Sequence, residues 1–346
     1  MHIADLLPVK EDLLICGTNW LGDSVMSMPA LQALRKRDPS GRLIMLAKPP
    51  LVPLWRMHPA VDEAVPLPPG PMGTLRAAWQ LRGGSFGRCF IFPGSFRSAL
   101  IPFLARVDER VGAAGHRRAW MLSRVVDVTP GVGNRHQLWE YMAIVGLAGD
   151  ASAPETPRLT VPAESAAAAR ACLSADQPWV GLVPGAARGP SKRWPAEYFG
   201  EAGRRLVEAA PVRIAIFGTS AEDGLCRAVA ENIGARAVNL AGRTSLPQLA
   251  ALLALCRVVI GNDSGAAHLA TAVGSTVVAI FGMTDPAKTG PLGAGHRVIT
   301  AEGPVRQARA IARRNEEAAA VLRSIRPDRV SSAALEILAA PGRQKS

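Results

Sequence analysis

A loop that carries a carboxylate follows the first apolar run of the chain. The run covers residues 13–16 (LLIC), and the segment GTNWLGD follows it over residues 17–23. Glycines let a loop pass close to a ligand. Asp23 is therefore a candidate general base at the carboxyl end of a strand, where open α/β sheets bind ligands. The alternative is that Asp23 only caps the helix expected over residues 23–36.

A basic loop in the second half of the chain has the composition of a phosphate or diphosphate site. The segment PGAARGPSKRWP spans residues 184–195, after one apolar run and before an expected helix. Glycine frees the backbone, and lysine and arginine place positive charge beside it. The candidate ligand residues are Gly185, Arg188, Lys192 and Arg193. The alternative is a solvated basic turn, with Trp194 packed on the core.

A second anion site is predicted where the segment GNDSGAAH leads from a strand into a helix over residues 261–268. The backbone N–H groups at the start of that helix would point at a bound anion, and Asp263 could bind sugar hydroxyls. The candidate residues are Asp263, Ser264, Gly265, Ala266 and His268. His268 has an equally good interpretation as a structural histidine. The loop over residues 281–291 follows the next strand and can reach the same edge.

Several other chemistries lack their sequence patterns. The chain has no Ser-His-Asp order, HExxH motif, P-loop or GxGxxG fingerprint, and its six histidines are dispersed. Its five cysteines form no CxxC pair. A zinc site, a disulfide scaffold and a nicotinamide-binding site are therefore not expected.

The elements that position these loops alternate between short apolar runs and helical stretches. Helices are expected over residues 195–209, 221–233, 246–255 and 264–273, and the segment 305–340 is also expected to be helical. Strands are expected near residues 13–16, 42–47, 88–92, 125–128, 180–183, 212–217, 258–260 and 277–281. Such alternation predicts an α/β fold, with parallel sheets covered by helices on both faces. A stretch rich in proline and alanine, at residues 149–178, is the expected linker between two Rossmann-like domains that face a cleft. We place one domain at residues 1–155, a second at 156–325, and a helix and tail at 326–346.

The charge of the chain implies an anionic partner. The 346 residues carry a net charge of +12. Residues 88–135 contain eight arginines against three acidic residues. This basic surface would include Arg97, Arg110, Arg117, Arg118 and Arg124. The alternative is a merely solvated face, and the excess of 34 arginines over six lysines can reflect genome composition. No signal peptide and no run of about 18 apolar residues is present.

The motifs, in this order, resemble those of the ADP-heptose:lipopolysaccharide heptosyltransferases, a family of GT-B glycosyltransferases. The matching segments cover about four fifths of the chain, over residues 13–290. They are GTNWLGDSVMSMPALQALR, PGSFRSALIPFLA, PGAARGPSKRWP, FGTSAED, NLAGRTSL and NDSGAAHLATAVGSTVVAIFGMTDP. The first two segments are more similar to heptosyltransferase II than to heptosyltransferase I. After residue 290 the resemblance fades.

The resemblance implies a role for each matching residue. Asp23 would be the general base, Lys192 would contact the donor diphosphate, and Asp263 would bind the donor sugar. Glu222 and Thr244 match positions on the adenosine side of the donor. The predicted acceptor contacts are Asn19, Arg97, Arg117 and Arg118. Asn19 departs from the family, in which many type II members have serine.

The implied reaction is an inverting transfer of heptose from ADP-L-glycero-D-manno-heptose to heptosyl-Kdo2-lipid A, with no metal or other cofactor. The protein would be cytoplasmic and would touch the inner membrane peripherally; its oligomeric state stays open. Two other functions remain: a GT-B transferase for another nucleotide sugar, and a non-enzymatic basic protein that binds nucleic acid. Aromatic residues make up only 5% of the chain, so stacking surfaces for bases are scarce.

Overall fold

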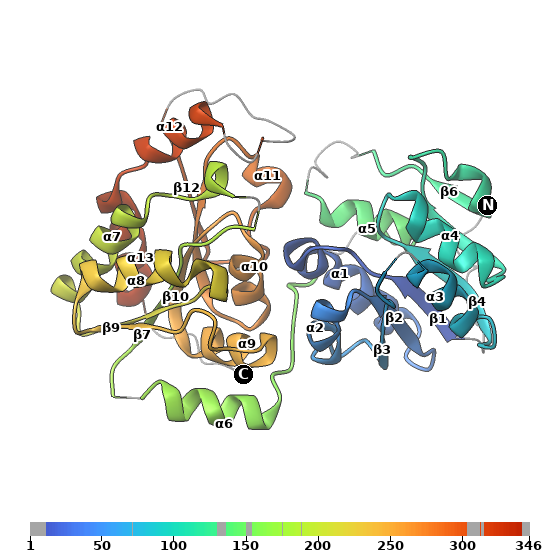
Figure 1. Cartoon of the computed structure of the whole chain (residues 1–346), viewed down its shortest axis with the longest axis horizontal. Coiled ribbons are helices and arrows are strands. Elements are labelled where there is room, and N and C mark those ends of the chain that lie inside the picture. The colour runs from blue at the N-terminus through green and yellow to red at the C-terminus, as the bar shows by residue number, and fades with distance from the viewer. Residues whose placement is uncertain are drawn as a thin grey trace. The chain divides into compact units, whose positions relative to one another are not determined.

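The chain folds into two compact units, Met1–Pro157 and Arg158–Ser346. A computed structural model describes residues 12–70, 72–129, 136–149, 154–174, 176–187, 189–302, 312 and 315–340 (Figure 1). Both units are α/β, and each has its own six-stranded sheet. No helix within these ranges is long and apolar enough to cross a membrane.

The N-terminal unit is built on a sheet with the strand order β3-β2-β1-β4-β5-β6, in which all neighbouring strands are parallel. The strands are β1 (Asp12–Cys16), β2 (Leu43–Ala47), β3 (Glu63–Pro66), β4 (Phe86–Ile91), β5 (Glu109–Ala113) and β6 (Arg124–Val126). The direction of chain progress across the sheet reverses between β1 and β4. Ligands of open α/β sheets bind at such a point, beyond the carboxyl ends of the strands.

Helices cover both faces of this sheet. They are α1 (Leu21–Arg37), α2 (Val52–Arg56), α3 (Gly73–Leu81), α4 (Phe96–Leu104) and α5 (Leu138–Ile144), with short 3-10 turns η2 (Pro49–Leu51) and η3 (Ala119–Met121). Side chains alternate along a strand. Accordingly, Leu14 and Cys16 of β1 join the core cluster with α3 and α4. Leu13 instead lies beside Leu34 of α1 and Val145, which follows α5.

The C-terminal unit repeats this architecture. Its sheet has the order β12-β11-β10-β7-β8-β9, again with parallel neighbours throughout. The strands are β7 (Trp179–Val183), β8 (Arg213–Ile216), β9 (Ala237–Asn239), β10 (Cys256–Asn262), β11 (Thr276–Phe281) and β12 (Arg297–Thr300). Read from β9, this is the order of the first sheet, so the predicted pair of Rossmann-like α/β folds is confirmed.

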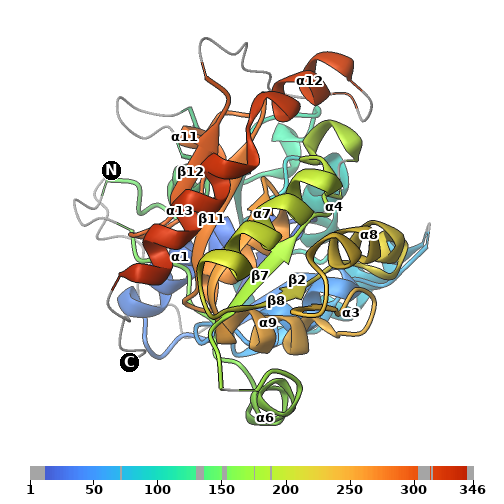
Figure 2. The same cartoon turned by 90° about the vertical axis from the view of Figure 1, so that its left-hand side faces the viewer.

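The core of this unit lies between its sheet and four helices, which include α13 beside α7 (Figure 2). The four are α7 (Ala196–Ala209), α8 (Asp223–Ile233), α12 (Glu316–Ser324) and α13 (Pro327–Ala339). The opposite face carries α10 (Gly265–Ala272), which packs against α9 (Leu246–Leu255), and α9 in turn packs against α6 (Ala163–Cys172). The remaining short elements are η4 (Pro190–Lys192), η5 (Ser220–Glu222) and α11 (Pro286–Thr289).

The C-terminal helix α13 belongs to this core, whereas the sequence analysis placed residues 326–346 outside the second domain, as a separate helix and tail. Val330 and Ala334 of α13 are fully buried, and they share a cluster with Ile260 of β10. The single helical segment expected over residues 305–340 is instead broken at Ile325, before Pro327 opens α13. Proline fixes its backbone in a conformation that suits the first turn of a helix, which explains the new start. Residues 303–311 lie outside the described ranges.

Candidate functional site

The two predicted anion-binding loops meet in the C-terminal unit. They follow β7 and β10, which are neighbours at the point where the strand order reverses. Lys192 in the first loop forms an ion pair with Asp263 in the second. The hydroxyl of Thr284, which follows β11, donates to the same Asp263 oxygen Oδ2 at 2.9 Å. The side chains of Lys192 and Asp263 are only 14% and 9% exposed.

The side chain of Asn262, at the end of β10, connects the two loops by hydrogen bonds. This side chain is fully buried. The Oδ1 atom accepts a hydrogen bond from the backbone N–H of Trp194 at 2.9 Å. The Nδ2 atom donates to the carbonyls of Pro184 at 2.9 Å and Gly185 at 3.3 Å. One side chain therefore ties both ends of the basic loop to the end of β10. Sequence reasoning missed this role, although Asn262 stands next to Asp263.

Trp194 itself packs on the core, as one interpretation of the sequence expected. It is 1% exposed, and its Nε1 donates to the carbonyl of Ile325 at 2.9 Å. The rest of that interpretation, a solvated basic turn, is wrong for Lys192, which is largely buried. The buried indole fixes the loop that carries Lys192 and Arg193.

Arg193 and Glu222 form the second polar pair of this unit. The guanidinium donates to Glu222 Oε1 at 3.3 Å. The other oxygen of Glu222 accepts from the N–H and hydroxyl of Thr219 at 3.0 and 2.9 Å. The absence of a side chain at Gly185 lets the Glu222 carboxylate approach the loop, because a Cβ atom there would lie 2.2 Å from Glu222 Oε1. The pair thus lies directly against the basic loop.

Three buried polar atoms near these pairs have no hydrogen-bond partner among the described residues. They are Ser191 Oγ, Arg193 Nε and Ser264 Oγ. Ser264 occupies the N-cap of α10, yet its side chain makes no capping hydrogen bond. An unpaired buried polar atom costs free energy. A ligand with several hydrogen-bonding oxygens would satisfy these atoms, and a helix N-terminus favours negative charge on that ligand.

The other donor-side candidates are distributed around this edge. Gly265 and Ala266 form the first turn of α10 and are partly exposed, while His268 in the same helix is 6% exposed. Thr244 follows β9, the outer strand of the sheet, two strands from β7. Arg188 lies outside the described residues. Within those residues, no group of three or more His, Cys, Asp or Glu side chains is arranged to hold a metal ion.

Asp23 lies at the corresponding place in the N-terminal unit, after β1. It is not the N-cap of α1, because Trp20 takes that position and Asp23 sits within the first turn. The Nε2 atom of Gln137 donates to Asp23 Oδ1 at 3.4 Å and to the hydroxyl of Tyr141 at 2.8 Å. Burial, reinforced by the charge of Asp23, raises the pKa of Tyr141 well above its usual value. Neither Gln137 nor Tyr141 stands near Asp23 in the sequence.

The predicted acceptor contacts differ in exposure. Asn19, Arg97 and Arg117 are exposed, and Arg97 also donates to Thr74 Oγ1 at 2.6 Å. Arg117 and His116 have positive φ angles of 54° and 44°. Such angles are unfavourable for side chains with a Cβ atom, and backbone strain of this kind clusters at functional sites.

Arg118 is not part of a basic surface, so that prediction is wrong. The residue is fully buried. Its guanidinium donates to the carbonyl of Ala113 at 3.0 and 2.7 Å, to Ser98 Oγ at 3.1 Å, and to the carbonyl of Pro93. These hydrogen bonds of the Arg118 guanidinium go to atoms of the protein, and they hold the strained turn against α4. Arg110 likewise donates to the carbonyl of Met121 at 2.6 Å.

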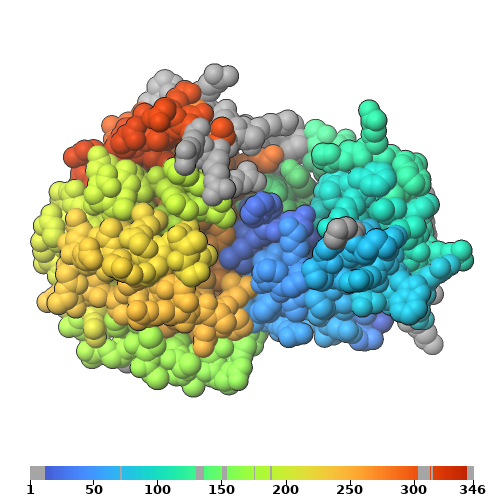
Figure 3. All heavy atoms as spheres, viewed as in Figure 1, coloured from blue at the N-terminus to red at the C-terminus, as the bar shows by residue number. Residues whose placement is uncertain are grey.

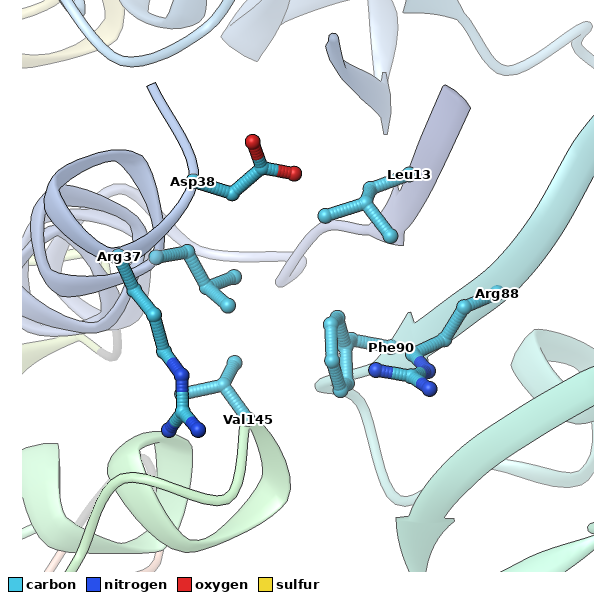
Figure 4. A pocket seen from close by; sticks show the side chains of 7 residues that line it. Leu13, Arg37, Asp38, Arg88, Phe90 and Val145 are labelled. Atoms are coloured by element: carbon cyan, nitrogen blue, oxygen red, sulfur yellow. The ribbon is translucent and has the colours of Figure 1, made fainter. Parts of the chain in front are cut away.

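A small cavity in this unit lies away from Asp23, at the amino ends of β1 and β4. Its lining includes Leu13, Arg37, Asp38, Arg88 and Phe90 (Figure 4). Its volume of about 20 Å³ is close to that of one water molecule. It is too small for a sugar or a nucleotide.

Comparisons with known proteins relate the chain to the heptosyltransferases. The model of glycosyltransferase family 9 (heptosyltransferase) matches residues 74–318. Lipopolysaccharide heptosyltransferase 2 of Salmonella typhimurium is 33% identical over 305 residues, which cover 83% of this chain and 87% of that protein. The protein of the same name from Escherichia coli is also 33% identical, with the same coverage.

Solved structures show the same relationship. The structure of E. coli ADP-heptose lipopolysaccharide heptosyltransferase II aligns with a TM-score of 0.81 and 28% identity, covering 94% of this chain and 98% of that one. A family 9 glycosyltransferase from Veillonella parvula has a TM-score of 0.84 at 19% identity, with 96% and 98% coverage, and supports the GT-B fold alone. The family match and the curated relatives confirm the resemblance that the sequence motifs indicated: the chain belongs to glycosyltransferase family 9, the heptosyltransferases.

Proposed function

We propose that this chain moves heptose from ADP-L-glycero-D-manno-heptose to heptosyl-Kdo2-lipid A, the inner core of lipopolysaccharide, with inversion at the anomeric carbon. The names of its relatives supply the substrate class. The observation that carries the proposal is the ion pair of Lys192 with Asp263 at the end of β10, next in sequence to buried polar atoms of Ser191, Arg193 and Ser264 that have no partner among the described residues.

The donor half of the proposal follows from charge. ADP gains negative charge as it leaves the sugar, and Lys192, Arg193 and the N-terminus of α10 are positive or partly positive groups at one edge of the sheet. Asp263 orients the Lys192 ammonium and is the group we assign to the donor sugar. Glu222 and Thr244 are assigned to the adenosine side. No metal is needed in this scheme, because cationic side chains and backbone N–H groups neutralise the diphosphate.

The acceptor half uses the N-terminal unit. A sugar hydroxyl is a poor nucleophile, so a carboxylate must take its proton as the new bond forms, and we assign this step to Asp23. Gln137 donates to Asp23 Oδ1 and so helps to hold this carboxylate in place. Asn19, Arg97 and Arg117 are the exposed groups assigned to the anionic acceptor, whose lipid anchor brings the protein to a membrane surface at the cytoplasmic side.

Parallel calorimetric titrations with ADP, UDP and GDP test the donor assignment, with a chelator present to remove metal ions. We expect ADP to bind selectively. Preference for UDP or GDP would assign the chain to another nucleotide sugar. If no nucleotide binds and DNA is retained in a salt-sensitive manner, the chain is a nucleic-acid-binding protein instead.

A further inference from the structure

Helix α3 has two apolar faces, and only one of them belongs to the core. Ala77, Ala78 and Leu81 are buried. In contrast, Leu75 is 48% exposed and Trp79 is 78% exposed, while Met72, just before the helix, is 53% exposed. Residues spaced by three and four positions lie on one side of a helix. The three exposed side chains therefore form a second apolar stripe, which the folding of this unit does not use.

The stripe continues across the neighbouring helix. A hollow of about 610 Å³ lies where Leu75 and Trp79 of α3 approach Leu104 at the end of α4. Phe96 of α4 is 42% exposed, and its ring lies 6.4 Å from that of Trp120, which is 63% exposed. Atoms of α3 and α4 lie together on the face of the N-terminal unit turned to the viewer in Figure 3, coloured light blue to cyan. Contiguous exposed apolar area of this kind marks an interaction surface.

The charge around the stripe has one sign. From residue 64 to residue 107 the chain contains five arginines and no acidic residue. Two of them, Arg76 and Arg82, are exposed and line the hollow beside Trp79. Arginine lays its stem along apolar surface and keeps its charged group in water. Tryptophan beside arginine is the composition of protein segments that lie at the boundary between headgroups and acyl chains.

We propose that this α3–α4 face, formed by Met72, Leu75, Trp79, Phe96 and Trp120 with Arg76 and Arg82 at its rim, docks on an anionic phospholipid bilayer. The indole of Trp79 and the side chain of Leu75 enter the interface, and the arginines pair with lipid phosphates. The inference deepens the proposed function, because it assigns the membrane contact to named apolar side chains. Arg97, one of the assigned acceptor contacts, borders this face, because its guanidinium donates to Thr74 of α3.

The charge pattern favours a lipid surface over a second copy of the chain. In a symmetric dimer the same patch meets itself, so Arg76 and Arg82 of one copy would face like charges of the other. Like charges across an interface oppose association. A bilayer rich in phosphatidylglycerol instead offers phosphates to the arginines, and each arginine near such a surface strengthens binding.

Flotation of the full-length protein with vesicles tests the proposal. The vesicles contain either phosphatidylethanolamine with phosphatidylglycerol, or phosphatidylcholine alone. We expect binding only to the anionic vesicles, and we expect the L75S/W79S double variant to bind at least about tenfold more weakly, since two apolar side chains no longer enter the interface. The R76A/R82A variant should bind anionic vesicles more weakly than the unchanged protein, and the difference should grow as the fraction of phosphatidylglycerol in the vesicles rises.

Matched controls separate this face from general effects. V298S removes an apolar side chain that is 40% exposed on the C-terminal unit, and R204A/R205A makes the same change in net charge on α7. Both should bind vesicles as the unchanged protein does. Quenching of tryptophan fluorescence by acyl-brominated lipid should fall in Trp79→Phe, which keeps the apolar stripe and therefore keeps binding.

The outcomes distinguish this inference from the proposed function. Equal vesicle binding by L75S/W79S and the unchanged protein would overturn the docking face, as would the absence of anionic-vesicle binding. A monomer–dimer shift caused by the double variant, without vesicle binding, would assign the face to a second copy. ADP titration of the same variant reports on the donor site alone. Intact ADP binding together with lost flotation supports the docking face. Loss of both would mean that the double variant is misfolded. In that case, flotation of the single variant Trp79→Ser tests the docking face.

Discussion

At the scale of single residues, the half-buried carboxylate of Asp23 is the group that we propose as the general base. It sits in the first turn of α1, where the helix dipole stabilises its charged form. A sugar hydroxyl is far less acidic than a carboxyl group, so a carboxylate can take its proton only as the new glycosidic bond forms.

Replacing Asp23 with alanine should reduce turnover by about 100-fold or more, because the acceptor hydroxyl loses its base. ADP affinity should not change, since the residue belongs to the other unit. Steady-state rates and ADP titration of the same preparation make the comparison. Asp108→Asn, an exposed carboxylate of the same unit, is the control. Turnover that survives in D23A would assign the proton to another group.

Lys192→Ala should weaken ADP binding by about 10- to 100-fold, the range for a charge-assisted hydrogen bond to phosphate. The variant also leaves Asp263 partly buried without its cation, so Lys192→Arg is needed as a second variant that keeps the charge. Lys36→Ala, which removes an exposed ammonium paired with Glu155, serves as control. Unchanged ADP affinity in K192A would rule out its contact with the diphosphate.

Arg117 and Arg118 are adjacent in sequence and should behave oppositely. Arg118→Ala removes a buried guanidinium that bonds to several carbonyls, so the free energy of unfolding should fall by about 3 kcal/mol. Arg117→Ala should leave stability unchanged and raise KM for the acceptor, because its side chain is exposed. Urea denaturation and acceptor kinetics of both variants test this. Equal stability losses would contradict the division of roles.

At the scale of elements, the donor site depends on one side chain that connects a strand end to a loop. Asn262 satisfies three backbone groups, on Trp194, Pro184 and Gly185. The described residues of the loop form no helix or strand apart from the short turn η4, so the shape of the loop comes from these contacts and from the buried Trp194. The position of Lys192 is therefore determined by residues that need not touch the donor.

Asn262→Ala should lower the free energy of unfolding by about 2 kcal/mol or more, because three buried backbone groups lose their partner. It should also weaken ADP binding, since the loop is no longer held to β10. Asn315→Ala removes only the capping residue of α12 and should cost about 1 kcal/mol with ADP affinity intact. A variant with full stability and full ADP affinity would disprove the role of Asn262 as a positioning residue.

At the scale of the whole molecule, each unit depends on a core that tolerates few charged groups. His58 illustrates this in the N-terminal unit, because it is 2% exposed and its Nδ1 accepts from the N–H of Ala60 at 3.3 Å. Burial lowers the pKa of His58 from its ordinary value of 6.5 to about 3. The folded protein thus binds this proton less readily than the unfolded chain.

Acidification should therefore destabilise the N-terminal unit. Between about pH 7 and about pH 5 the unfolded chain binds a proton at His58, whereas the folded unit does not. The free energy of unfolding should therefore fall by about 2 kcal/mol. Urea unfolding at both pH values measures the change. His58→Asn keeps an acceptor for Ala60 but cannot titrate, so most of the dependence should disappear. His116→Asn, at an exposed site, should retain it; an unaltered pH dependence in H58N would refute the assignment.

Much of the fold followed from local pattern. Apolar runs alternating with helical stretches predicted two parallel α/β units, and the expected helices at residues 195–209, 221–233, 246–255 and 264–273 correspond to α7, α8, α9 and α10. Strands β3, β5, β9 and β12 were missed, because they are short and only partly buried. Partly exposed strands lack the continuous apolar run that reveals a central strand.

The sequence by itself determined the family, through motifs that extend over about four fifths of the chain, and it determined which glycine, lysine and aspartate residues follow the strands. Only the tertiary structure decided which of these side chains meet. Lys192 and Asp263 pair because β7 and β10 are neighbours although 71 residues separate the two side chains. Gln137 donates a hydrogen bond to Asp23, from which it is separated by 114 positions in the sequence. Arg117 and Arg118 look alike in the sequence, yet one is exposed and the other buried, because burial is set by how the turn packs on α4 and not by residue type.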